Sequence, residues 1–190
     1  MSQLPKAPPT CRGFVYDHVV SVVDGPDYHP NLPPLSDDWD DSDPEENRRF
    51  EWLGDSALAI RMSLKIYEMC PGAKVEFYDL VRGILLSNDV QTHIMQKIGT
   101  PGDFPSQKST ADAFEMLVGA SYTENLYHDQ GMAEDFHNWF DDMFTPLVQA
   151  AEAAHRTFEQ WKVDCEFARV RAGGVPLAPH IPKRKNTAKS

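Results

Sequence analysis

Apolar and polar positions between residues 44 and 165 recur mostly with the period of an α-helix. The first such stretch, over about residues 44–69, carries an apolar stripe at 3.6-residue spacing, which predicts a long helix. The stripe consists of Leu53, Ala57, Ile60 and Leu64. Asp43 can cap this helix, Pro44 suits its first position, and Glu46 completes a capping box. The Cys70-Pro71-Gly72 turn predicts its end.

Five further helices are predicted in the rest of this region. Their expected ranges are 75–86, 88–99 with Asn88 as the cap, 109–123, 132–143 and 146–165. In the stretch 132–143, Phe136, Trp139, Phe140 and Met143 share one face, and such an aromatic stripe is typical of a core. Thr145 and Pro146 indicate a break, with a new helix after it. There is almost no strand signal, so the predicted fold class is all-α.

The two ends of the chain lack this periodicity. Residues 1–43 are rich in proline and then acidic, and their one apolar run, residues 14–23, fits a strand or a short helix. The acidic run over residues 37–46 is typical of a solvated linker. Residues 166–190 form a basic tail, either a solubilising disordered end or a contact for RNA or a nuclear import receptor. The expected organisation is therefore an N-terminal segment 1–43, a helical domain 44–165 and a tail 166–190. The basic residues of the tail are Lys183, Arg184, Lys185 and Lys189.

Composition fits an ordinary soluble protein and argues against membrane insertion or secretion. The 190 residues are 41% hydrophobic and 25% charged, and no apolar stretch is long enough to span a membrane. The N-terminus has no apolar signal region, so we expect an intracellular protein. Three widely spaced cysteines indicate neither a disulfide framework nor a metal motif. The formal net charge of −11 opposes phosphate binding, so composition does not suggest a nucleic-acid partner.

Two pairs of carboxylates are the candidate chemistry. Glu51 and Asp55 are four residues apart, and Asp112 and Glu115 are three apart, so each pair shares one face of its helix. If the two faces pack together, four acids converge, and they need cations to stay ionised. Oxygen ligands of this kind favour Mg²⁺, with Mn²⁺ as an alternative. Spacing alone is weak support, because such pairs are also common on solvated helices.

Two glycines accompany these pairs. Gly54 lies between the acids of the first pair and Gly119 follows the second by one turn. A glycine within a helix costs about 1 kcal/mol relative to alanine. We therefore expect Gly54 to allow the close approach of another backbone or of a substrate.

Three segments together resemble the ribonuclease III family. Residues 47–58, NRRFEWLGDSAL, are similar to the family signature NERLEFLGD(A/S)VL. Residues 108–120, KSTADAFEMLVGA, resemble the second family motif KxxADxFEALIGA, and residues 85–88, LLSN, resemble LVSN. Order and spacing agree over roughly residues 44–145. The resemblance implies a helical endonuclease domain. We expect no double-stranded-RNA-binding domain after it, because the tail is too short for one.

The resemblance also implies the chemistry of the site. Glu51, Asp55, Asp112 and Glu115 stand at the family's catalytic, metal-binding positions. Family members act as dimers on double-stranded RNA and leave 5′-phosphate and 3′-hydroxyl ends. Trp52 replaces a phenylalanine that contributes to subunit packing, so the resemblance implies a homodimer. The lack of a long apolar stretch implies no membrane partner. For RNA contacts, the expected cations are Arg48, Arg49, Arg61, Lys65 and Lys108.

The chain departs from the family pattern at several points. Arg48 occupies a position that is usually glutamate, and Val75 stands where an acid is usual, with Glu76 adjacent. The helix that normally precedes the signature, with its THxS-like motif, has no counterpart in the sequence pattern. These departures leave a second interpretation open, a catalytically inactive scaffold or RNA-binding subunit of the same fold. The retention of all four acids favours the enzyme.

Overall fold

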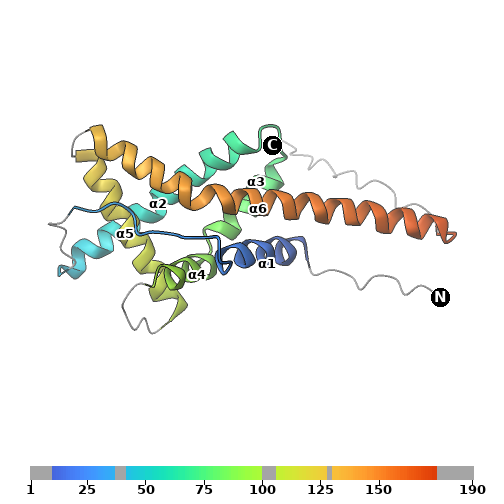
Figure 1. The fold of residues 1–190 in the computed structure, drawn as a ribbon, viewed down its shortest axis with the longest axis horizontal. Helices are drawn as coiled ribbons and strands as arrows, with labels where there is room; N and C mark the ends of the chain where they lie inside the picture. Colours follow the sequence, from blue (N-terminus) through green and yellow to red (C-terminus); the bar gives the residue numbers. More distant parts are fainter. Residues whose placement is uncertain (1–9, 37–41, 100–105, 128–129, 175–190) are drawn as a thin grey trace, which may run out of the picture. The chain divides into compact units, whose positions relative to one another are not determined.

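The described part of the chain is entirely helical. The computed structural model describes residues 10–36, 42–99, 106–127 and 130–174, and all regular secondary structure in these ranges is α-helix, which confirms the all-α class (Figure 1). The chain divides into two compact units, residues 1–155 and residues 156–190. None of the described helices is long and apolar enough to cross a membrane.

Six helices account for these ranges. They are α1 (Cys11–Val23), α2 (Pro44–Met69), α3 (Val75–Leu85), α4 (Asn88–Ile98), α5 (Gln107–Tyr127) and α6 (Gln130–Arg171). The four from α2 to α5 lie close to the predicted ranges. Local chemistry explains this agreement at α2: Asp43 accepts hydrogen bonds from the amides of Glu45 and Glu46 at 2.9 and 3.4 Å. At the start of α4 the cap is Ser87, one residue before the expected Asn88, because the Ser87 hydroxyl accepts from Val90 N.

Residues 11–23 form a helix, which settles the choice between strand and helix. Thr10 caps α1 by accepting from Gly13 N at 3.2 Å. Val15, Val19 and Val23 follow one another at four-residue spacing and are fully buried. The segment before residue 44 therefore contributes side chains to the hydrophobic core of the first unit. Of the acidic run expected as a linker over 37–46, residues 37–41 lie outside the described residues, whereas residues 44–46 begin α2. The expected start of the tail at residue 166 is wrong, because α6 continues to Arg171; the chain from residue 175 lies outside the described residues.

The predicted break at Thr145 and Pro146 is wrong. A single helix, α6, runs from Gln130 to Arg171 with Pro146 inside it. A proline within a helix costs about 3 kcal/mol, because it removes one backbone hydrogen bond and crowds the preceding turn. The side chains on both sides of it, Phe144 and Leu147, are fully buried. Their packing outweighs the local cost and keeps the helix continuous.

The apolar stripe predicted on α2 is divided between core and surface. Ala57 is buried, whereas Ile60 and Leu64 are 63% and 48% exposed. The core face consists instead of Leu58, Met62 and Ile66. The expected aromatic face of α6 is in the core, as predicted: Phe136 lies 5.6 Å from Tyr122, and Trp139 lies 6.4 Å from Phe114, between ring centroids.

Candidate metal-binding site at the crossing of α2 and α5

Two glycines allow α2 and α5 to cross in backbone contact. A Cβ atom on Gly54 would lie 1.8 Å from the carbonyl oxygen of Glu115, and one on Gly119 would lie 1.9 Å from that of Phe50. No larger residue fits at either position without moving a backbone. The expectation that Gly54 permits close approach is thus confirmed, and the neighbour is the backbone of α5.

This crossing gathers three of the four predicted carboxylates. Oxygen atoms of Glu51, Asp112 and Glu115 lie within 4.8 Å of one another, and all three residues are half-buried. Asp55 is exposed and is not a member of this trio. Its charge nevertheless acts on Glu115, which places it beside the cluster. We call the trio together with Asp55 the carboxylate cluster.

Glu115 is the member whose electrostatics are most disturbed. Burial raises the pKa of its carboxyl, the hydrogen bond from Gln91 lowers it, and the charges of Asp55, Asp112 and Glu51 raise it further, with a net increase. Removal from water and like charges both disfavour the ionised form. The negative charges of the carboxylate cluster are therefore only partly balanced by nearby positive charge.

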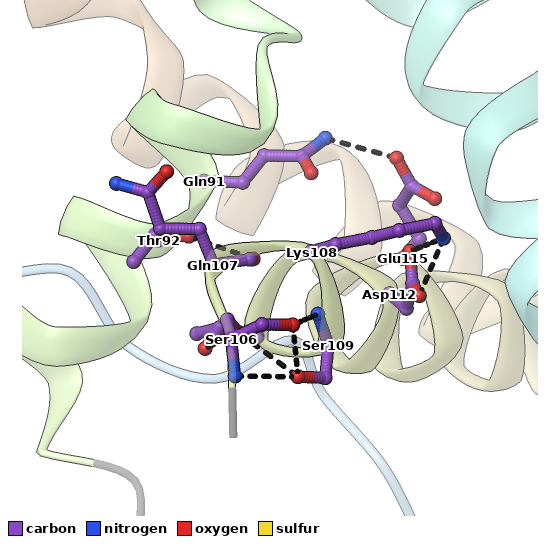
Figure 2. Close-up of polar contacts among 9 residues, drawn as sticks. Gln91, Thr92, Ser106, Gln107, Lys108, Ser109, Asp112 and Glu115 are labelled. Atoms are coloured by element: carbon purple, nitrogen blue, oxygen red, sulfur yellow. Dashed lines mark hydrogen bonds and ion pairs between the residues drawn. The ribbon is translucent and has the colours of Figure 1, made fainter. Parts of the chain in front are cut away.

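Lys108 contributes one positive charge next to the carboxylate cluster. Its ammonium donates to both oxygens of Asp112, at 2.8 and 2.7 Å, from one turn earlier on α5 (Figure 2). That hydrogen bond raises the pKa of Lys108. The lysine side chain is exposed, so it can leave Asp112 when another cation competes for the carboxylate.

Gln91 of α4 is a member of the site that the sequence reasoning missed. Its Nε2 donates to Glu115 Oε1 at 3.2 Å, and only 1% of the residue is exposed (Figure 2). The sequence feature that could have indicated it is a glutamine on the helix face that also carries the apolar residues Val90, Ile94 and Met95, all of which are buried. Such a polar residue on a core face needs a hydrogen-bond partner.

Polar contacts hold α4 against the start of α5. The Thr92 hydroxyl lies 3.1 Å from the carbonyl oxygen of Gln107, and Gln107 Nε2 donates to Asp89 at 2.9 Å. Ser106 and Ser109 bond reciprocally, each amide to the other's hydroxyl at 3.0 and 3.2 Å, and so cap α5 (Figure 2). These contacts fix Gln91 relative to Glu115.

The chemistry of the cluster fits a hard divalent cation. Three carboxylates whose oxygens converge within 4.8 Å provide the oxygen ligands that Mg²⁺ and Mn²⁺ accept. The residues able to hold the ion are Glu51, Asp112 and Glu115, with Asp55 at the edge. Glu76, considered as an additional acid, is exposed in the first turn of α3 and lies outside the trio.

The chain is similar to ribonuclease III. Ribonuclease 3 of Chlorobaculum tepidum is 32% identical over 107 residues, which are 47% of this chain and 36% of that protein. Ribonuclease 3 of Shewanella sp. strain W3-18-1 is 33% identical over 93 residues, 43% of this chain and 41% of that protein. The chain thus spans about two fifths of the length of these relatives. No family model matches, and no solved structure matches significantly. The matches indicate a distant, partial relationship to a ribonuclease III-like family.

The cations expected to contact RNA differ in how they are placed. Lys65 has a side chain only 13% exposed and pairs with Asp141 at 2.9 Å. Arg61 is half-buried with its guanidinium over the ring of Phe140. Arg48 is exposed, near the start of α2. The two cations further along α2 therefore lie against the protein.

Proposed function

We propose that this protein is a metal-dependent endoribonuclease that hydrolyses phosphodiester bonds of double-stranded RNA, leaving 5′-phosphate and 3′-hydroxyl ends. The observation that carries the proposal is the convergence of Glu51, Asp112 and Glu115 from two helices that are far apart in the sequence. The partial similarity to proteins named Ribonuclease 3 supports the same chemistry.

The chain's own residues have distinct parts in this proposal. Glu51, Asp112 and Glu115 bind Mg²⁺, and the backbone contact at Gly54 lets their helices lie close enough for these side chains to converge. A bound Mg²⁺ lowers the pKa of a water molecule and neutralises charge that develops on the phosphate. Lys108 holds Asp112 before the ion binds. Half-burial of the trio limits its solvation and strengthens its attraction for a cation.

The decisive experiment replaces one carboxylate by its amide. Glu115→Gln keeps size and hydrogen bonding but removes the charge, so cleavage of long duplex RNA in Mg²⁺ should fall by about 100-fold or more. Circular dichroism should show an unchanged helix content. Ca²⁺ in place of Mg²⁺ should permit RNA binding with little cutting.

A matched control is Glu68→Gln, which changes an exposed glutamate near the end of α2 and should cut like the wild type. Equal cleavage by wild type and Glu115→Gln would show that the site is misassigned. If the wild type cuts no duplex RNA in Mg²⁺ or Mn²⁺, the scaffold function replaces the enzyme. Arg48, which takes the place of the usual acid, is the feature that favours that second function.

A further inference from the structure

Gln91 has more polar capacity than the described structure uses. It is 1% exposed, its Nε2 donates to Glu115, and its Oε1 has no hydrogen-bond donor within reach in the described part of the chain. A buried amide oxygen without a donor is unfavourable, because it has lost water and gained no partner. A methionine would fill the same volume without this cost. The amide therefore has a use that packing does not explain.

The position of the amide indicates that use. Figure 2 shows the Gln91 side chain extending from α4 with its amide toward Glu115 of α5. A carboxylate can only accept, so the Nε2 donor fixes the plane of the Glu115 carboxylate through Oε1 and leaves Oε2 for another contact. Because Thr92 and Gln107 tie α4 to α5, the amide is held in place.

We propose that Gln91 is a positioning residue that orients Glu115 for a divalent cation. With Oε1 of Glu115 engaged by the amide, Oε2 is the oxygen left to bind the ion. This inference rests on the proposed metal-dependent function but concerns cation binding, which can be measured without RNA.

The test is the affinity for Mn²⁺, measured by electron paramagnetic resonance titration of the whole chain without RNA. Gln91→Met should weaken Mn²⁺ binding by about 10-fold, the lower end of the effect of losing a residue that orients a metal ligand. In EDTA its melting temperature should equal or exceed that of the wild type, because the unpaired amide is gone. The increase in melting temperature that Mn²⁺ produces should shrink. A merely structural residue would show the opposite, a lower melting temperature in EDTA and an unchanged affinity.

Two further variants make the result specific. Tyr28→Phe removes a different buried hydrogen bond, from the Tyr28 hydroxyl to the carbonyl oxygen of Met143, and should leave Mn²⁺ affinity unchanged. In a Glu115→Gln background, Gln91→Met should cause no further loss, because the group that it orients is already altered. Gln91→Leu repeats the test if the methionine variant does not fold.

The outcomes separate the two proposals. Unchanged Mn²⁺ affinity in Gln91→Met and Gln91→Leu, or no Mn²⁺ binding by the wild type, overturns the role of Gln91. A wild type that binds Mn²⁺ through Gln91 and Glu115 but cuts no duplex RNA overturns the proposed function and leaves the role of Gln91 standing.

Discussion

Glu115 is the residue whose environment makes the clearest prediction about stability. Its pKa in the folded chain is raised above the ordinary 4.5, first by burial and then by neighbouring carboxylates. The folded chain therefore holds this proton more tightly than the unfolded chain does. The associated contribution to the free energy of unfolding is complete below about pH 4.5 and is lost as pH rises through the folded pKa.

The metal-free protein should accordingly lose stability relative to Glu115→Gln as pH increases, since glutamine does not titrate. Thermal unfolding of both proteins in EDTA, from pH 4 to pH 8, measures the difference. Adding Mn²⁺ should reverse the trend for the wild type. A difference in melting temperature that stays constant over this range would contradict the prediction, and Glu68→Gln serves as the control for loss of an exposed glutamate.

At the scale of elements, the site depends on how closely α2 and α5 approach. Gly54→Ala would place a methyl group 1.8 Å from the carbonyl oxygen of Glu115, so the helices must separate. Overpacking of this kind costs about 1–3 kcal/mol, and it moves Glu51 away from Asp112 and Glu115. Urea unfolding should therefore show a lower stability, and Mn²⁺ titration a weaker site.

Gly83→Ala is the matched control for this prediction. Gly83 is also inside a helix, α3, but its nearest neighbour would be the flexible guanidinium of Arg12 at 3.3 Å. The change should gain up to about 1 kcal/mol from helix propensity and leave Mn²⁺ affinity unaltered. Full Mn²⁺ affinity in Gly54→Ala would show that the close crossing does not determine the site.

At the scale of the whole molecule, the outer side of α2 indicates self-association. Trp52, Ile60 and Tyr67 are 74%, 63% and 64% exposed, and exposed apolar residues gathered on one helix are typical of an interaction surface. We expect a homodimer formed through this side with Trp52 as an anchor. Light scattering at tens of micromolar should give twice the chain mass.

Trp52→Ala should shift this equilibrium toward the monomer, because a buried aromatic at an interface contributes about 2 kcal/mol or more. Phe167→Ala removes an aromatic of similar exposure, 61%, from the end of α6 and should leave the mass unchanged. A wild type that scatters as a monomer would contradict the prediction.

The net charge of the whole chain leads to a prediction about the proposed binding of RNA. With a net charge of −11, few cations are left to neutralise phosphates, so we expect weak binding that falls steeply with salt. Titration of duplex RNA in Ca²⁺ between 50 and 200 mM salt measures the slope. Arg48→Ala should reduce the slope by about 1, whereas Lys65→Ala should not, because Lys65 pairs with Asp141 and is mostly covered. Tight binding that is insensitive to salt would contradict this electrostatic account.

Helix boundaries were predictable wherever the determining chemistry is local. Asp43 and Pro44 set the start of α2, Cys70 its end, and Gly99, with a φ of 74°, the end of α4. These residues act on the amides and carbonyls nearest to them, which a sequence displays directly. The two acid pairs and their glycines were visible for the same reason, because spacing along one helix fixes which side chains share a face.

Only the tertiary structure decided what those faces meet. Pro146 lies within a continuous helix because buried side chains on both sides outweigh the local cost of the proline. Ile60 follows the apolar period yet is exposed, and Gln91 breaks the period yet is buried against Glu115. Whether a side chain is buried, and which group it contacts, depends on residues far away in the chain. At the site, the backbone contact at Gly54 brings Glu51 to Glu115 across 64 positions of sequence.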